Sequence, residues 1–390
     1  MRCLPLILCW LATACGAAAT KSTHPTTGPA PAVPRDDLAR AVPDPGAPTG
    51  KIAVKDPRHV IDLDIIRIRA GESAVTASKE LFDKATAQYQ AKNTIDAMAR
   101  FRQLVREFPD SIYAPSSLFN VAAILDGQGD YKGTVAALLE LVQQYPESRE
   151  SVEGHLYIAA LQAEHKEWSD AAATLSDVLG RKNLTYADRI EANARRGYVE
   201  IELKHYDLAD TFLDDAVASW RAAARIEDPY YIAMAHYYRG ETMHRRFAEA
   251  PVRLPDDQLI TDLEHKRALA VKAYDRWVES LHFKHAYWAT AAGYQMSQIF
   301  VELWEDHVKA PYPTKLAPAG RPTYVKEVHD RVREHLTKAL DGHKMNVELA
   351  KAYGVDTEWS KSSEQRAAAI EQMIAADVPA SWVTPGSPAP

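Results

Sequence analysis

Apolar residues recur at helical spacing in four successive stretches of the chain. In each stretch they follow one another at steps of four, three and one residues, which places them on one face of an α-helix. The stretches are offset by 37, 37 and 38 residues, so the pattern predicts a tandem repeat with one such helix in each copy. The positions of this face are held by Ala97, Phe101, Leu104, Val105 and Phe108 in the first copy, Thr134, Leu138, Leu141, Val142 and Tyr145 in the second, Ala171, Leu175, Val178 and Leu179 in the third, and Ala209, Leu213, Ala216 and Val217 in the fourth.

Aromatic and small residues recur with the same period. The aromatics are Tyr131, Trp168 and Tyr206, and the small residues are Ala122, Ala159 and Gly197. Each aromatic follows a polar turn, and each small residue lies in a predicted helix before that turn. A small side chain lets two helices approach closely. Each copy is therefore predicted to be a helix, a tight turn and a second helix, with the aromatics packed between neighbouring copies.

This pattern resembles the tetratricopeptide repeat, whose motif has Gly or Ala in the first helix, an aromatic near the turn and a closing proline, here Pro109 and Pro146. The family period is about 34 residues, and the extra residues of this chain follow the proline, in DSIYAP and ESRESV. These linkers resemble those of bacterial envelope lipoproteins of the BamD and Tol-associated coordinator class. The resemblance covers about residues 74–220 and implies an all-α solenoid of about six helix pairs.

Residues 221–377 are predicted to continue the array as divergent tetratricopeptide-like repeats with insertions. Gly240 and Gly293 take the place of the small residue. About two dozen extra residues with two prolines are expected to separate the helices of the fifth pair, and the segment KAPYPTKLAPAGRP at 309–322 interrupts the sixth. A final helix near 363–376 is expected to cover the end of the solenoid, because a terminal repeat needs a polar outer face.

The N-terminus has the features of an export signal. Arg2 and the apolar run over residues 4–12 predict a signal peptide over residues 1–14. Cys15, at its end, resembles the acylated cysteine of bacterial lipoproteins and is the predicted lipid-attachment site. Ala12 stands where lipoproteins usually have Leu. The alternative is therefore ordinary signal-peptidase cleavage, in which Cys15 has no role.

Three further segments lie outside the repeats. Residues 15–57 are rich in Pro, Ala and Thr and are expected to form a disordered tether, as is the proline-rich tail at 378–390. Residues 58–73 contain HVIDLDIIRIRAG, which alternates in part and predicts an extended or short helical lead-in. After the signal, no stretch reaches the roughly 20 apolar residues of a membrane span. We therefore expect a lipid-anchored protein at the bacterial outer membrane, facing the periplasm.

The charge and the polar motifs exclude several classes of function. The net charge is −7, and no basic patch of the kind that binds nucleic acid is present. All three cysteines lie in the first 15 residues, and the fourteen histidines are scattered without an HExxH pattern. The chain also lacks a phosphate-binding glycine loop and a GxSxG elbow. These patterns predict no cofactor, no metal site and no enzymatic activity.

The remaining candidate site is the concave face that the first helices of such repeats line. Aligning the copies places a set of aromatic and polar residues on that face, beside Ala160, and we predict that they contact a protein partner. The set is Phe119, Asp126, Tyr198, Tyr237, Glu241 and His244. The alternative for each aromatic is that it fills the core between repeats.

The sequence therefore predicts a non-catalytic scaffold or adaptor in a bacterial outer-membrane or periplasmic complex, with envelope proteins as partners. A subunit of a motility, secretion or cell-wall coordinating machine is an equally good interpretation. A cell-wall enzyme with an α-superhelical body and a purely structural spacer are two further alternatives.

Overall fold

A computed structural model of the protein describes residues 72–376. Within that range the chain forms thirteen α-helices and no strand, as the repeat pattern predicts. None of these helices combines the length and the apolar character that crossing a membrane requires. Several predicted features lie outside the described residues: the signal peptide (1–14), Cys15, the tether (15–57), all but the last two residues of the lead-in (58–73), and the tail (378–390).

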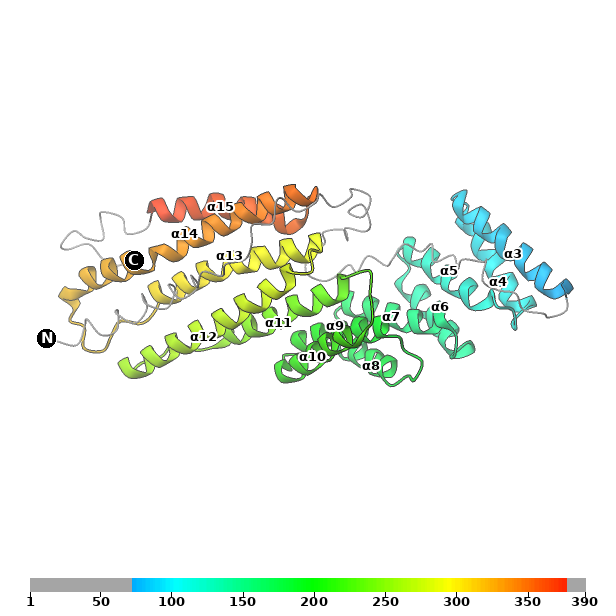
Figure 1. The fold of residues 1–390 in the computed structure, drawn as a ribbon, viewed down its shortest axis with the longest axis horizontal. Helices are drawn as coiled ribbons and strands as arrows, with labels where there is room; N and C mark the ends of the chain where they lie inside the picture. Colours follow the sequence, from blue (N-terminus) through cyan, green and yellow to red (C-terminus); the bar gives the residue numbers. More distant parts are fainter. Residues whose placement is uncertain (1–71, 377–390) are drawn as a thin grey trace. The chain divides into compact units, whose positions relative to one another are not determined.

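Six consecutive helix pairs are followed by a final helix (Figure 1). The pairs are α3 (Glu72–Gln90) with α4 (Thr94–Glu107), α5 (Ala114–Gly127) with α6 (Tyr131–Gln144), α7 (Arg149–Glu164) with α8 (Trp168–Leu179), α9 (Tyr186–Glu202) with α10 (Tyr206–Ala222), α11 (Tyr230–Glu249) with α12 (Asp256–Leu281), and α13 (Ala286–Val308) with α14 (Arg321–Tyr353); α15 (Glu358–Ala376) is last. The predicted all-α solenoid of about six helix pairs is confirmed.

The chain divides into two compact units, and the division falls inside α11, between Ala235 and His236. We call the described residues before the division, 72–235, the N-terminal unit and those after it, 236–376, the C-terminal unit. The sequence pattern placed the change in character earlier, at residue 220. Each unit is described by itself below.

The turn inside each pair of the N-terminal unit has one residue with a positive φ. That residue is Gly129 in the second pair (75°), and Lys92, Lys166 and Lys204 in the others (62°, 62° and 64°). Each N–H donates to the carbonyl three residues earlier, as Gly129 does to Asp126 at 2.8 Å. This conformation suits glycine and costs a lysine about 1 kcal/mol. A residue with a positive φ thus recurs in the turn of every pair of this unit, although it is a lysine in three of the four turns.

The predicted apolar faces of the second helices form the interior of the N-terminal unit. Phe101, Leu138, Leu175 and Leu213 occupy equivalent positions and are at most 1% exposed. The predicted small residues lie where the helices of a pair meet. A Cβ atom added to Gly197 would lie 2.4 Å from Leu213 Cγ. A side chain at this position would collide with the second helix, so the predicted role of the small residue is confirmed.

The periodic aromatics connect each repeat to the next. The Tyr131 ring stacks on His165 with the ring centroids 3.8 Å apart, and its hydroxyl donates a hydrogen bond to Glu167. Trp168 meets the edge of Tyr198 at 5.7 Å. Both Tyr131 and Trp168 are only half-buried. Their truncation should therefore cost less than the about 3–5 kcal/mol of a fully buried aromatic.

The C-terminal unit is built from longer helices. α12 and α14 have 26 and 33 residues, against 14 in α5 and in α6. The extra residues of the fifth pair were expected to separate its two helices. They instead lengthen the helices, and only residues 250–255 connect α11 to α12. The predicted interruption of the sixth pair is present between α13 and α14, where Pro318–Gly320 form a short 3-10 helix. The predicted final helix is α15, which packs on α13 and α14.

Gly197→Ala should destabilise the N-terminal unit by about 1–3 kcal/mol, because the added methyl group overpacks a fully buried contact with Leu213. Urea unfolding measures this loss. Gly127→Ala is the matched control, since a Cβ atom there has no neighbour within 4 Å. Equal stabilities of the two variants would contradict the assigned helix contact.

Candidate partner-binding face

The first helices α5, α7 and α9 carry an apolar strip at the positions that line the concave face of a repeat array. The strip consists of Phe119, Ala123, Leu156, Ala160, Ala163, Ala194, Tyr198 and Ile201. All of these residues are buried, from Ala194 at 0% exposed to Phe119 at 8%. We call this set the concave strip.

Acidic residues stand at both ends of the concave strip. Glu153 and Glu191 lie toward the N-terminal ends of α7 and α9, and Asp126, Glu164 and Glu202 lie toward the C-terminal ends of α5, α7 and α9. All five are half-buried. Arg149 forms an ion pair with Glu153 at 3.1 Å, and Arg195 forms one with Glu191 at 2.6 Å. The face is therefore apolar along its middle and carries carboxylates at its margins, which we call the acidic edges. Arginines offset the charge at the margin formed by Glu153 and Glu191.

Three of the residues predicted from the sequence belong to this face. Phe119 packs against Tyr157 with the ring centroids 6.1 Å apart, and Tyr198 packs against Trp168. Asp126 is half-buried, near the end of α5. At 8% and 7% exposed, Phe119 and Tyr198 contribute to the packing of the repeats. A role for these three residues in binding a partner stays a prediction.

Tyr237, the fourth predicted residue, lies in the interior of the C-terminal unit. It is 2% exposed, and its ring packs against Trp288 and Trp359 at centroid distances of 5.2 and 6.3 Å. Its hydroxyl accepts a hydrogen bond from Gln295 at 3.2 Å. Burial raises the pKa of this hydroxyl well above its usual value. In this arrangement Tyr237 fills the core, which is the alternative role given for the aromatics.

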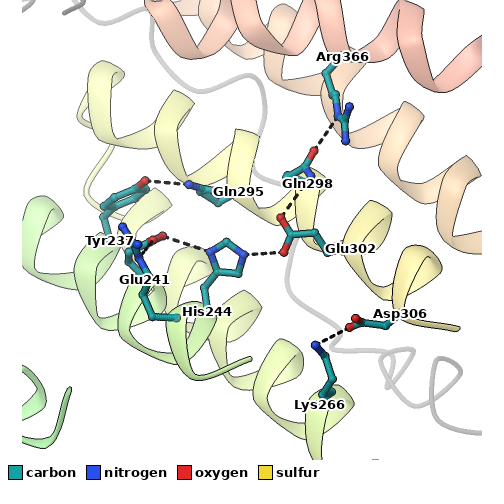
Figure 2. A network of polar contacts seen from close by, with 10 residues as sticks. Tyr237, Glu241, His244, Lys266, Gln295, Gln298, Glu302, Asp306 and Arg366 are labelled. Carbon is teal, nitrogen blue, oxygen red and sulfur yellow. Dashed lines mark hydrogen bonds and ion pairs between the residues drawn. The ribbon is translucent and has the colours of Figure 1, made fainter. Parts of the chain in front are cut away.

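The other two predicted residues, Glu241 and His244, form the centre of a buried polar network (Figure 2). His244 donates from Nε2 to Glu302 at 2.6 Å and from Nδ1 to Glu241 at 3.4 Å. Arg245 adds a hydrogen bond to the second oxygen of Glu241 at 3.0 Å. Burial disfavours a charge on His244, but the two carboxylates outweigh this effect and raise its pKa to about 10. His244 is thus held as an imidazolium between two carboxylates.

Further polar contacts lie on α12, α13 and α15, in residues that the sequence analysis did not single out. Gln298 donates to Glu302 at 3.3 Å and accepts from Arg366 of α15 at 2.9 Å. Lys266 of α12 forms an ion pair with Asp306 at 3.0 Å (Figure 2). The α13 members, Gln295, Gln298, Glu302 and Asp306, stand at steps of three and four residues and so share one helix face. This spacing can be seen in the sequence. It does not by itself indicate a buried network, because a row of polar residues along one helix face usually faces water.

The network has the charges of a structural cluster rather than the parts of a catalytic site. Both nitrogens of His244 are engaged by carboxylates, and a protonated imidazole cannot act as a general base. Among residues 72–376, no three His, Cys, Asp or Glu side chains are placed to hold one metal ion. Removing one partner from a buried ion pair typically costs about 3–5 kcal/mol. The network therefore joins α11, α12, α13 and α15 in a single arrangement.

A cavity of about 90 Å³ lies in the N-terminal unit beside α7 and α9. Its lining includes Arg149, Asp188, Glu191, Trp220 and Tyr231. Sites for small molecules usually measure about 300–1,000 Å³. This cavity is too small for such a ligand, so the concave face is the stronger candidate for a binding surface.

Comparison with known proteins agrees with this fold. A sequence model of the tetratricopeptide repeat matches residues 81–111 and 116–148. No curated protein matches the chain in sequence. The chain therefore contains tetratricopeptide repeats, which generally serve as non-catalytic modules that bind other proteins.

Three solved structures are similar to the chain at low identity. The C-terminal part of a TPR repeat-containing protein from Cytophaga hutchinsonii has 12% identity and a TM-score of 0.40, covering 75% of this chain and 95% of that one. A tetratricopeptide repeat protein from Parabacteroides merdae has 15% identity and a TM-score of 0.35, covering 71% and 99%. The apo form of RapI has 12% identity and a TM-score of 0.38, covering 77% and 99%.

Raising the pH from 7 to 10 should weaken the C-terminal unit through His244. Its pKa is about 10 in the folded protein and about 6.5 in an unfolded chain. The stabilisation is complete below pH 6.5 and is lost as the pH rises toward 10, by roughly 1.4 kcal/mol per pH unit. Urea unfolding of the wild type and of His244→Gln at several pH values measures how the free energy of unfolding depends on pH. The variant should lose the part of this slope that comes from His244. The exposed His265→Gln is the control and should keep it. A wild-type slope in His244→Gln would contradict the assignment.

Proposed function

We propose that the protein is a non-catalytic scaffold that binds protein partners on the concave face of α5, α7 and α9. The observation that carries the proposal is the concave strip with its acidic edges. The strip is apolar over three neighbouring repeats, which suits contact with the apolar side chains of a peptide segment. The acidic edges favour basic residues beside those side chains, because opposite charges improve the selection of a partner and its rate of association.

The proposed site of action is the bacterial envelope. The support is the short apolar run before Cys15 and the lack of cysteine in the remainder of the chain. In this proposal, a lipid on Cys15 holds the protein at the outer membrane, and the solenoid faces the periplasm. A scaffold so placed binds envelope proteins, such as assembly, motility, secretion or cell-wall components, within reach of the membrane.

A cell-wall enzyme is the weaker candidate. Such an enzyme needs an accessible acid beside aromatic side chains that bind a sugar. Glu241, with Tyr237 nearby, is the described residue closest to this pattern. His244 and Arg245 pair with its carboxylate and lower its pKa against the effect of burial, and the residue is 8% exposed. A buried carboxylate that is paired in this way is suited to packing rather than to proton transfer.

Photo-crosslinking in cells tests the scaffold proposal. A photoreactive residue at Asp126 or Glu164 should capture a protein partner, because both positions lie on the acidic edges. Leu139 and Asp170 are matched controls, since both are exposed on second helices. Adducts from the first pair of positions alone support the proposal. Equal capture from all four positions, or no capture from Asp126 and Glu164, would refute it.

Cys15→Ala should release the protein from the membrane fraction, because the lipid is the proposed anchor. Membrane fractionation of cells and the mass of the mature N-terminus measure the effect. Cys9→Ala is the control and should leave both unchanged. A Cys15→Ala variant that stays in the membrane fraction with an unaltered N-terminal mass would show that the protein is not lipidated there.

A further inference from the structure

The cavity of the N-terminal unit beside α7 and α9 has an apolar floor. Ile190 and Ile232 line it at 2% and 0% exposed, and Ile226 and Trp220 line it as half-buried residues. An apolar cavity of about 150 Å³ is large enough to bind benzene. At about 90 Å³, this cavity is too small for a ring of that size with substituents, but it has room for a short alkyl chain.

The mouth of the cavity is charged. Arg149, Ala187 and Asp228 line the same cavity, and all three are exposed. Because the isoleucines are buried and these three residues are exposed, the cavity opens to solvent beside them. An occupant therefore meets apolar side chains first at the floor and charged groups where it leaves the cavity.

The two arginines of this region are already neutralised. Arg149 forms ion pairs with Asp188 at 2.5 Å and with Glu153 at 3.1 Å. Arg195 lies behind the lining and forms an ion pair with Glu191 at 2.6 Å. Two guanidinium groups are thus matched by three carboxylates, so neither arginine offers an uncompensated positive charge to an anion.

Asp228 is a fourth carboxylate, and its charge is not offset. One of its oxygens accepts a hydrogen bond from the backbone N–H of Tyr230 at 2.9 Å. Within residues 72–376, no lysine, arginine or histidine forms an ion pair with Asp228. The surroundings of the cavity are therefore negative overall, and they favour an occupant with a positive charge at the mouth.

We propose that this cavity binds an alkylammonium group. The alkyl chain lies against Ile190 and Ile232, and the ammonium lies at the mouth beside Asp228. Trp220 lines the same cavity, and an indole ring attracts a nearby cation. The group belongs either to a small free amine or to a lysine side chain of a protein, since both present the same chemistry. This inference goes beyond the proposed function, because it does not depend on whether the concave strip binds a partner.

Titration with n-butylammonium, followed by NMR of isoleucine methyl groups, tests the proposal. The full chain carries Cys15→Ser so that it is not acylated, and the ionic strength is held constant. The methyl signals of Ile226 and Ile232 should shift and saturate, whereas the signal of Ile370 in the C-terminal unit should not move. n-Butanol has the same chain without the charge and should bind about fivefold more weakly, as expected for the loss of one exposed ion pair.

Three variants locate the site. Asp228→Asn should weaken n-butylammonium binding about fivefold, because it removes the charge but keeps an oxygen that can accept from Tyr230. Glu227→Gln is the matched control, since Glu227 is exposed beside Asp228 but does not line the cavity. Ala187→Phe should abolish binding by filling the mouth. Ala187 is exposed, so this variant should remain folded, and urea unfolding checks that it does.

Titration with Nα-acetyl-lysine N-methylamide distinguishes the two sources of the ammonium. Binding at least as tight as that of n-butylammonium would assign the cavity to a lysine side chain, and weaker or absent binding would assign it to a free amine.

Three results would overturn the proposal: no saturable shift with n-butylammonium, equal affinities for n-butylammonium and n-butanol, or an unchanged affinity in Asp228→Asn. Partner capture from Asp126 and Glu164 is a separate readout, so this proposal and the scaffold proposal fail independently.

Discussion

The structure depends on the close approach of two helices at one small residue in each repeat. Gly197 lies against Leu213, Gly240 against the Trp277 ring, and Gly293 against Asn346, and in each case a Cβ atom would lie within 2.4 Å of the partner. This contact sets the distance between the helices of a pair. Because the helices of a pair are this close, the faces that remain apolar must be buried by the neighbouring repeats, as in other solenoids.

The helices of the two units pack against their neighbours in different ways. In the N-terminal unit short helices repeat the same contact, and the equivalent concave positions of α5, α7 and α9 align into one apolar strip with acidic edges. In the C-terminal unit the helices are longer, and part of the contact between them is polar. There α13 presents polar residues toward its neighbours, and the ion pairs around His244 and Lys266 satisfy them. The first arrangement favours a binding surface, and the second favours a fixed core.

The sequence analysis predicted the repeated part of the fold well because its signals were periodic. The spacing from Phe101 through Leu138 and Leu175 to Leu213 identified the buried face, and the place of Gly197 identified the helix contact. The C-terminal helices were harder to predict. Residues 256–308 contain no proline, so the extra length continues as helix, but without a repeated pattern its extent was not evident.

The candidate site was harder to predict than the fold, for a physical reason. Concave positions and core positions both carry aromatic residues, and only the packing of distant segments separates them. Tyr237 is buried by Trp288 and Trp359, which follow it by 51 and 122 residues. The spacing of Glu302 along α13 is that of a solvated helix face, and only its contact with His244, 58 residues earlier, makes it part of a buried network. The carboxylates of the acidic edges come from three different helices, so no single stretch of sequence shows that they lie along one face.

The account depends on the concave positions of α5, α7 and α9 aligning into one buried apolar strip. Thiol labelling tests it most directly, because replacing Cys3, Cys9 and Cys15 leaves a chain without cysteine. In that background Ala160→Cys should react with a maleimide at least about tenfold more slowly than the exposed Leu139→Cys, since its reaction requires local opening. Equal labelling rates of the two thiols in the full chain would contradict the claim.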